Sequence, residues 1–454
     1  MLLGLALAWP AAWGGEAPAP EAPPPRNWRE ELKNPVPWFS WGADERLRQV
    51  YIENPLDLLD EVDDTYHFFR IRTRLWGTLG PFFRDEALDQ PNGLSLYARL
   101  AYEPRPVVRF PGDDHVGPQW SEVFWDNLYL DWKRIGGLPV SLRIGRQDLA
   151  YGRYWVILDG TPLDGSRSIY SDAAKLTIHL DDIQSALDLF VVDNAGDQKR
   201  LTPWDDDDRL VCEYDTRLYG AYFTSNYFDG HKLGAYYIYK NDDGIGKGGD
   251  LPGRIVHTVG IPVEGRITDA LDYYAELGHQ WGSEDKVTRK GWGFNSELGY
   301  RFHDVAWVPR LFGGYEYLSG DDPGRRHFGG WDPVLARWPH WSELYVYRWA
   351  LECGLPGNYT NLHRITAGVE AQPTEKLRLV FDLSHLMADE HAAGRDFPYS
   401  DGLNRGQLAT AKLFYEFTDW ASMHLWAEYL EPGGYYDDVT DDAFFLRWQV
   451  TFRF

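Results

Sequence analysis

The chain ends in a segment whose apolar side chains recur at every second position, and this pattern constrains the fold more than any other feature. One parity is wholly apolar: Phe444, Leu446, Trp448, Val450, Phe452 and Phe454. The other parity holds Phe445, Arg447, Gln449, Thr451 and Arg453. A period of two predicts a β-strand with one apolar face, and this strand stops at a terminal phenylalanine. Strands that close bacterial outer-membrane barrels typically end in this way, whereas a soluble sandwich would seldom leave its most apolar face at a chain terminus.

Segments with a similar alternation recur along the whole chain. Many of them reach the ~9–11 residues that a tilted strand needs to cross a bilayer. We predict an all-β chain with strands near residues 38–52, 66–79, 94–103, 122–132, 139–148, 173–181, 183–193, 213–224, 231–241, 253–262, 270–282, 291–303, 309–319, 361–372, 376–387, 406–418, 421–431 and 443–454.

The lengths of the connections support this count. Single-chain bacterial barrels have an even number of strands, short periplasmic turns and longer outer loops. Here the connections after even-numbered strands are short, as at 419–420, and several after odd-numbered strands are long, as at 149–172 and 320–361. The alternation survives only if the apolar stretch 344–354 lies inside an outer loop, and the connection 80–93 is an exception because it is long for a periplasmic turn. The prediction is an 18-stranded antiparallel transmembrane β-barrel.

The N-terminal residues predict export of the chain to the cell envelope. Residues 1–15 form an apolar run that ends in small residues, which is typical of the hydrophobic and cleavage regions of a secretory signal. Five prolines follow within 17–25, so we expect residues 16–37 to be an extended tether. The barrel would then occupy residues 38–454, in the bacterial outer membrane.

Charge and motif content exclude several other classes of protein. A net charge of -24 argues against a nucleic-acid partner. Residues 244–249 match a dinucleotide fingerprint, but no helix follows them, so a phosphate would lack the helix N-terminus that it needs. The cysteines match no metal-binding spacing, and we expect neither a cofactor nor a metal. An exported compartment permits a disulfide between Cys212 and Cys353, whose separation the sequence leaves open.

Strand parity predicts which charged side chains face the lumen. Arg70, Arg72 and Arg74 share one parity, opposite the apolar row that includes Ile71 and Leu75. A charged side chain on the lipid face costs ~2–4 kcal/mol near the midplane, so these arginines should point inward. The same rule predicts six further pore-lining residues: Arg99, Arg143, Lys175, Arg364, Lys412 and Arg447.

Two interpretations of this basic set stay open. Inward-facing acids are also predicted: Glu103, Glu276, Glu297, Glu370, Asp382, Glu416 and Glu428. Lumen arginines can pair with such acids to brace a wide barrel, or they can serve an anionic solute. For Arg70, Arg72 and Arg74, the repulsion between like charges two residues apart favours an anionic visitor or several acid partners.

Several sequence blocks resemble the alginate-export family of outer-membrane porins. They lie in order at 145–152 (GRQDLAYG), 159–167 (DGTPLDGSR), 273–282 (YYAELGHQWG) and 309–321 (PRLFGGYEYLSGD). The residues of the first loop that carry the resemblance are Arg146, Gln147, Tyr151, Gly152 and Arg167. The resemblance implies an 18-stranded barrel with an electropositive constriction that passes an anionic polysaccharide outward across the outer membrane.

The leading hypothesis is a passive channel for an alginate-like anionic polysaccharide or another anionic solute. Its partners would be that solute, outer-membrane lipids and periplasmic export proteins. The alternatives are an outer-membrane enzyme and a carbohydrate-binding β protein whose tryptophans stack on sugars. The inward acids are too numerous to nominate one catalytic pair, and we therefore do not expect an enzyme.

Overall fold

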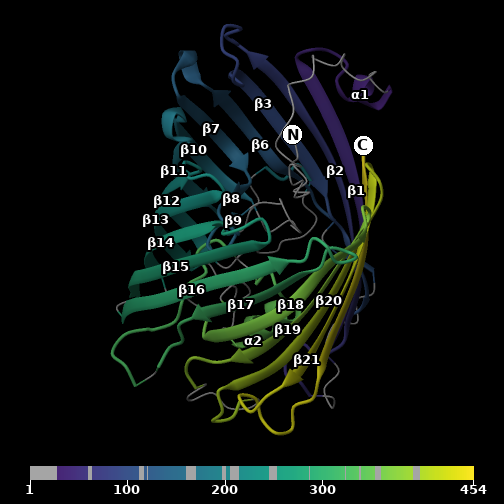
Figure 1. Cartoon of the computed structure of the whole chain (residues 1–454), viewed down its shortest axis with the longest axis vertical. Helices are drawn as coiled ribbons and strands as arrows, with labels where there is room; N and C mark the ends of the chain where they lie inside the picture. The colour runs from purple at the N-terminus through teal and green to yellow at the C-terminus, as the bar shows by residue number, and fades with distance from the viewer. Residues whose placement is uncertain are drawn as a thin grey trace.

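Eighteen long antiparallel strands form one closed barrel in the computed structural model (Figure 1). The structure describes residues 28–454 apart from 60–63, 112–116, 120, 160–169, 197–200, 205–213, 245–252, 286, 323, 337–338, 353–358 and 392–398. The barrel strands are β1 (Phe39–Glu53), β2 (Tyr66–Phe82), β3 (Gly93–Tyr102), β6 (Val123–Lys133), β7 (Val140–Gln147), β10 (Ser171–Leu180), β11 (Ser185–Asn194), β12 (Tyr214–Ser225), β13 (His231–Gly244), β14 (Arg254–Arg266), β15 (Leu271–Glu284), β16 (Val287–Arg301), β17 (Arg310–Leu318), β18 (Leu362–Thr374), β19 (Leu377–Met387), β20 (Asn404–Thr418), β21 (Ala421–Pro432) and β22 (Ala443–Arg453).

The first and last strands pair with each other, which closes the wall. Their register runs from Asp44 opposite Arg453 to Glu53 opposite Phe444. Beyond the register, the Phe454 amide donates to the carbonyl of Ala43 over 2.8 Å, and the Phe454 ring lies 5.1 Å from that of Trp41. The terminal phenylalanine therefore completes the seam between the two ends of the chain.

Side-chain burial follows the parity that the sequence predicts. On β2 the Leu75 side chain is 52% exposed and faces outward, whereas Arg74 beside it is only 5% exposed and faces inward. On β22 Phe445 and Arg447 are buried inside the barrel. The prediction of an 18-stranded antiparallel β-barrel is confirmed, and so is the inward direction of these residues.

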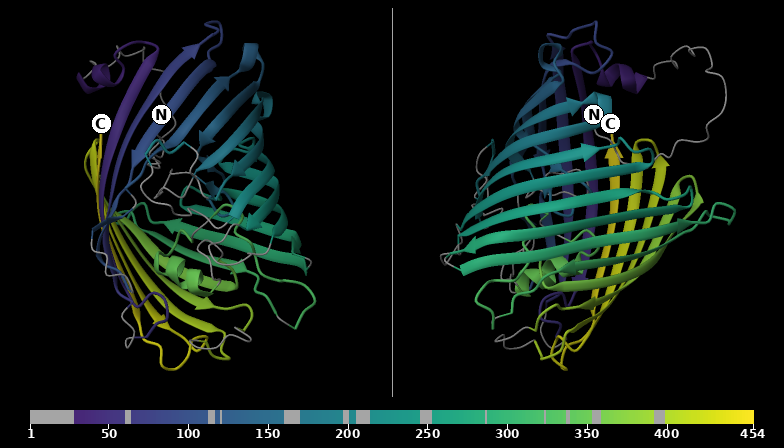
Figure 2. Two further views of the ribbon diagram at one scale, coloured as in Figure 1. Left: turned by 180° about the vertical axis from the view of Figure 1, so that it is seen from behind. Right: turned by 60° about the vertical axis from the view of Figure 1, so that its left-hand side comes forward.

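The long connections lie at one end of the strands, apart from the turn at 83–92, and this end also holds the two-residue turn between β15 and β16. Two of the short turns are single 3-10 turns, Ile135–Gly137 and Asp181–Ile183. The long connections hold the minor strands β4 (Arg105–Arg109), β5 (Gly117–Gln119), β8 (Leu149–Ala150) and β9 (Leu158–Asp159) and the helix α2 (Leu344–Glu352). The stretch 344–354 thus begins as a helix inside the connection between β17 and β18, and this helix lies within the ring of strands (Figure 2).

The long turn at 80–93 is an exception in the structure as well. Strands β2 and β3 extend into it, so residues 83–92 remain between them. The side chain of Asn92 holds this segment together, because it accepts from the Asp85 amide over 2.7 Å and donates to the Asp85 carbonyl over 2.9 Å. The turn is therefore ordered by local polar contacts despite its length.

The structure differs from the expected extended tether at its end. Residues Trp28–Lys33 form the short helix α1, with acids in its first turn and Lys33 in its last turn, which suits the helix dipole. The indole of Trp41 donates to the Leu32 carbonyl over 2.7 Å and ties α1 to the barrel rim. The expected signal at 1–15, most of the tether, the glycine-rich stretch 245–249 and both cysteines lie outside the described residues.

No helix in the described part of the chain is long and apolar enough to cross a membrane.

Deleting Phe454 should impair barrel assembly, because the deletion removes the seam contacts to Ala43 and Trp41. We expect a several-fold lower amount of folded, heat-modifiable protein in the outer membrane, measured by gel shift with and without heating. The control is Phe83→Ala, since Phe83 is 83% exposed in the turn after β2. An undiminished folded amount in the deletion variant would contradict a role of Phe454 in closure.

The alternation of connection lengths predicts which loops face the outside of the cell. Val439 lies exposed in a long connection and Leu138 lies exposed in a short turn. In a Cys212→Ser/Cys353→Ser background, Val439→Cys should react with a membrane-impermeant thiol reagent on intact cells. Leu138→Cys should react only after the outer membrane is opened, and the reverse pattern would invert the topology.

Candidate functional site

One side of the lumen carries a concentrated set of arginines. We call Arg46 and Arg48 of β1, Arg70, Arg72 and Arg74 of β2, Arg99 of β3 and Arg447 of β22 the basic wall. These strands are neighbours around the seam, and their register sets Arg46 opposite Arg72 and Arg48 opposite Arg70. Like charges directly opposite in a sheet repel each other, so the wall needs compensating groups.

Acids compensate part of this charge. Glu103 contacts Arg46 over 3.1 Å and Arg70 over 2.8 Å, and Asp44 accepts from Nε of Arg74 over 2.9 Å. Asp126 accepts from Nε of Arg99 over 2.6 Å. The ion pairs of the basic wall therefore include the bracing contacts that one interpretation of the sequence predicts.

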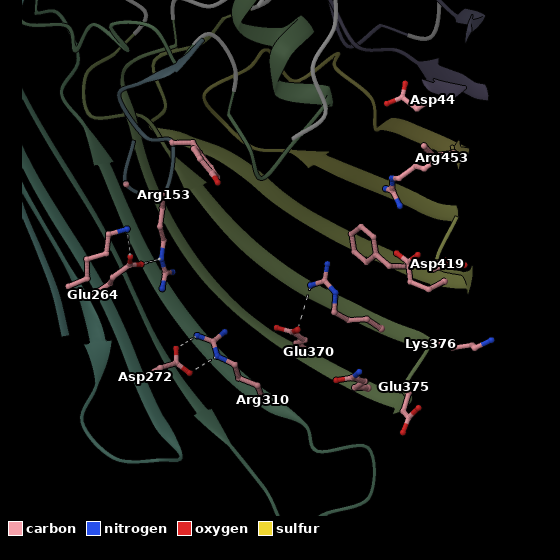
Figure 3. Close-up of a pocket in the computed structure, with 18 of the residues that line it drawn as sticks. Asp44, Arg153, Glu264, Asp272, Arg310, Glu370, Glu375, Lys376, Asp419 and Arg453 are labelled. Carbon is pink, nitrogen blue, oxygen red and sulfur yellow. Dashed lines mark hydrogen bonds and ion pairs between the residues drawn. The ribbon is translucent and has the colours of Figure 1, made fainter. Parts of the chain in front are cut away.

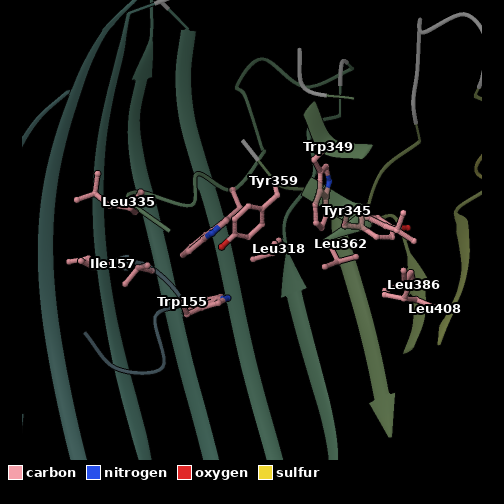
Figure 4. Close-up of a cluster of buried hydrophobic side chains, with 14 of the residues drawn as sticks. Trp155, Ile157, Leu318, Leu335, Tyr345, Trp349, Tyr359, Leu362, Leu386 and Leu408 are labelled. Atoms are coloured by element: carbon pink, nitrogen blue, oxygen red, sulfur yellow. The ribbon is translucent and has the colours of Figure 1, made fainter. Parts of the chain in front are cut away.

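Two long connections fold into the barrel and pack against each other (Figure 4). The indole rings of Trp155 and Trp331 stack 5.0 Å apart, and the Leu335 amide donates to the Val156 carbonyl over 3.0 Å. We call residues 149–159 and 331–352 the inward loops. They fill the part of the lumen near the long-loop end.

Glycines in the wall make room for the stacked tryptophans. Gly278 and Gly293 face each other in register on β15 and β16. A Cβ atom at Gly278 would lie 2.6 Å from the Trp331 ring, and one at Gly293 would lie 2.7 Å from the Trp155 ring. Only glycine at these two positions lets the rings approach the wall so closely.

Buried charges anchor the second inward loop to the wall. Asp332 contacts Nζ of Lys240 over 2.6 Å and Arg254 over 3.5 Å. Burial raises the pKa of Asp332, but Lys240 and Arg254 outweigh this effect and hold the pKa below its ordinary value. The carboxylate thus remains charged, and its removal would leave two buried cations without this partner.

Helix α2 is held at both ends. At its start, Glu428 of β21 accepts from the Ser342 hydroxyl over 2.6 Å and from the Glu343 amide over 2.7 Å. At its end, Glu352 accepts from Nη1 of Arg405 over 2.8 Å. An acid near the helix start and a cation near its end also suit the helix dipole.

The two inward loops share a further contact through His340. Its Nε2 donates to the Tyr154 carbonyl over 3.0 Å. Burial lowers the pKa of His340 to about 4. The ring is therefore neutral at physiological pH, and this contact persists without a charged partner.

A cavity of about 2650 Å³ lies between the inward loops and the short-turn end of the barrel. Arg46, Arg72 and Arg74 of the basic wall line it on one side. Acids of β14 to β18 line the other side, including Glu264, Asp272, Glu297 and Glu370 (Figure 3). Side chains of both charges thus line one cavity.

Arginines moderate the acidic side of the cavity. Arg153 reaches from the first inward loop to Glu264 and Glu297, each over 3.2 Å. Arg310 of β17 contacts Glu297 over 2.8 Å and also pairs with Asp272. Sequence reasoning missed Arg153 and Arg310, although Arg153 directly follows the first family-like block.

Of the nine predicted pore residues, Arg72 and Arg74 line the cavity. The others face the lumen in contact with wall or loop residues. Their contacts include Arg70 with Glu103, Arg99 with Asp126, Arg143 with Asp131, Lys175 with Asp188, Arg364 with Glu316, Lys412 with the Trp426 ring and Arg447 with Glu343. Arg46 was not predicted, although it shares the inward parity of its strand.

The family-like residues of the first loop serve its attachment to the wall. Arg146 contacts Asp172 over 2.7 Å, and Gln147 donates to the Ala173 carbonyl over 3.0 Å. Tyr151 donates to Asp188 over 2.7 Å and stacks on Tyr222 at 4.4 Å. Gly152 has a φ of 58° and lines the cavity, and Arg167 lies outside the described residues.

Replacing Trp155 and Trp331 by alanine should loosen the inward loops, because loss of a buried tryptophan costs ~3–5 kcal/mol of packing. We expect a larger single-channel conductance in planar bilayers for Trp155→Ala/Trp331→Ala. Trp307→Ala is the control, since Trp307 is exposed in a short turn. Unchanged conductance would show that these loops do not restrict the passage.

Comparisons with known proteins agree with the architecture. A family model described as "Alginate export" matches residues 116–393, and no curated protein sequence matches the chain. Similar solved structures include OpdL of Pseudomonas aeruginosa (TM-score 0.55, 13% identity, 91% of this chain and 98% of that one). They also include OccAB2 of Acinetobacter baumannii (TM-score 0.56, 12% identity, 91% and 98%). These likenesses concern the fold.

The family match covers more than half of the chain, and the matched barrel fold places the protein in the bacterial outer membrane. The protein is a channel rather than an enzyme. The chain belongs to the alginate export family of outer-membrane β-barrels.

Proposed function

We propose that the channel passes anionic solutes, and in particular a carboxylated polysaccharide of the alginate type, along the basic wall. The observation that carries the proposal is the presence of Arg46, Arg72 and Arg74 on one side of the cavity. A low-dielectric wall focuses the field of such a group on the passage. Carboxylates would meet guanidinium groups that can bind them through two parallel hydrogen bonds.

The ion pairs of the basic wall support the proposal by keeping its side chains in place. Arginines of the wall pair with Asp44, Glu103, Asp126, Asp148 and Glu343. A guanidinium group that is held in position along the cavity would act on an anion without first having to be ordered.

The acidic side of the cavity would keep such a solute moving. Glu264, Glu297 and Glu370 would make this side less favourable for carboxylates than the basic wall, although arginines offset part of their charge. Conduction requires binding that is favourable enough for entry and weak enough for release. Several arginines in a row at the spacing of alternate strand residues would share the solute so that no single one traps it.

Outward transport and delivery by periplasmic export partners form part of the same proposal. The cavity opens at the short-turn end, beside Asn34, Phe228 and Trp420, which is the periplasmic end by the rule for bacterial barrels. A polymer entering there would reach the inward loops next. Those loops would then have to shift for the chain to pass.

The test is ion selectivity in planar bilayers. Wild-type protein should favour anions, with the preference fading as salt rises, because screening acts over ~8 Å at 0.15 M and less at higher salt. The variant Arg46→Ser/Arg72→Ser/Arg74→Ser should lose most of this preference, and the corresponding Glu variant should shift it towards cations. The Lys variant keeps the charges and should retain the preference.

The matched control is Arg217→Ser, because Arg217 lies exposed on the outer surface of β12 beside Asp193. It should leave the reversal potential unchanged. Each variant is first checked for heat-modifiable folding. A cation preference in the wild type, or a Glu variant with an unchanged reversal potential, would assign the arginines to bracing alone.

A further inference from the structure

The outward faces of β14, β15 and β16 carry an ordered series of side chains. These strands belong to the wall turned towards the viewer in the right-hand panel of Figure 2. Counted from the long-loop end, three successive rows in register are His257–Trp281–Lys290, Val259–His279–Trp292 and Ile261–Leu277–Phe294. Residues of the opposite parity, such as Gln280 and Arg289, are buried inside the barrel. The rows thus change from polar and aromatic to purely apolar towards the middle of the wall.

The outermost row is organised by ring contacts. The imidazole of His257 and the indole of Trp281 stack at 5.3 Å with an interplanar angle of 2°. The Tyr237 hydroxyl lies 2.8 Å from Nδ1 of His257. When that hydroxyl donates to Nδ1, the proton of the neutral ring sits on Nε2, which is then a donor for a further acceptor.

Histidine in the second row has a different role. Nδ1 of His279 donates to the Gly291 carbonyl over 3.2 Å, because a carbonyl can only accept. Its ring lies 4.1 Å from that of Trp292. His279 therefore positions Trp292, which is 48% exposed, while Trp281 in the row above is 38% exposed.

The charge of this face has one sign. On the outward parity of β14, β15 and β16, Lys290 is the single Lys, Arg, Asp or Glu, and it is exposed at the long-loop end. Asp285, at the turn between β15 and β16, accepts from the Gly253 amide over 3.1 Å. An anionic group on this face would therefore meet a cation and no carboxylate within the three strands.

We propose that the row His257–Trp281–Lys290 binds the phosphorylated sugar headgroup of an acylated lipid in the outer leaflet. His257 and Lys290, at the two ends of this row, lie ~10 Å apart, because two inter-strand spacings separate them. Lys290 and Nε2 of His257 would donate to phosphate oxygens, and such charge-assisted bonds are the strong ones. The Trp281 ring between them offers an apolar face to the sugar, and its position at the wet end of an apolar wall suits an amphipathic ring.

The lower rows match the rest of such a lipid. Ile261 and Leu277 are 59% and 49% exposed, and they continue directly below the proposed headgroup site. Acyl chains descending from the headgroup would lie on them. The site lies on the outside of the barrel, so it is independent of the solute that passes through the lumen.

The experiment measures lipid binding by native mass spectrometry of the detergent-solubilised full chain. The probes are diphosphorylated lipid A and the same lipid with its phosphates removed. The test variant is His257→Gln/Lys290→Gln, which keeps polar side chains of similar size. The matched control is His231→Gln, because His231 lies at the start of β13 and lines the cavity at the opposite end of the barrel, away from the proposed site. Heat-modifiable folding is checked for each protein.

Wild-type protein and the control should prefer the diphosphorylated lipid by about fivefold or more, which is the order expected from one or two charge-assisted bonds. The double variant should bind both lipids with similar affinity. A folded double variant that still prefers the diphosphorylated lipid as strongly as the wild type does would overturn the proposal. A wild type that does not distinguish the two lipids would also overturn it. Wild-type dimers that the double variant abolishes would assign the face to a second copy of the chain instead.

Discussion

The hydrogen-bonded seam between β1 and β22 is the constraint on which the rest of the molecule depends. Within a bilayer, each unpaired backbone polar group costs several kcal/mol, so a sheet can span it only when it has no free edge. The register from Asp44–Arg453 to Glu53–Phe444 removes that edge. Closure then fixes which parity of every strand meets lipid and which meets the lumen, and it brings the arginines of β22, β1, β2 and β3 onto one wall.

Closure of eighteen strands also creates a problem of width. Barrels of this size enclose an aqueous channel that wall side chains alone do not fill. Here the inward loops occupy that space, with their aromatic residues stacked against Gly278 and Gly293 and their charges paired with Lys240 and Arg405. The same loops define the inner limit of the cavity in which the basic wall is accessible. The partial filling of the lumen and the access of the basic wall to the cavity are therefore two consequences of one packing arrangement.

Much of the fold follows from sequence pattern alone, because strand parity and connection length are local properties. The number of strands, the inward direction of Arg72 and Arg74 and the loop position of 344–354 were all predictable on that basis. The contacts of the inward loops were not, since the Trp155–Trp331 stack joins segments far apart in the chain. Parity shows that an arginine faces inward, but it does not show whether the side chain lines the cavity, as that of Arg72 does. The glycines at 278 and 293 are where the rings approach the wall closely, but a glycine in a strand does not identify the side chain that packs against it.

The central claim is that the cavity beside the basic wall carries a positive potential. Thr78 of β2 lines this cavity, so Thr78→Cys in a Cys212→Ser/Cys353→Ser background provides a local probe. The measurement is the rate of its reaction with a negatively charged and a positively charged methanethiosulfonate, each normalised to the rate with a free thiol in solution. A faster normalised reaction with the anionic reagent, diminishing at high salt, is the predicted result. A faster normalised reaction with the cationic reagent would contradict the account.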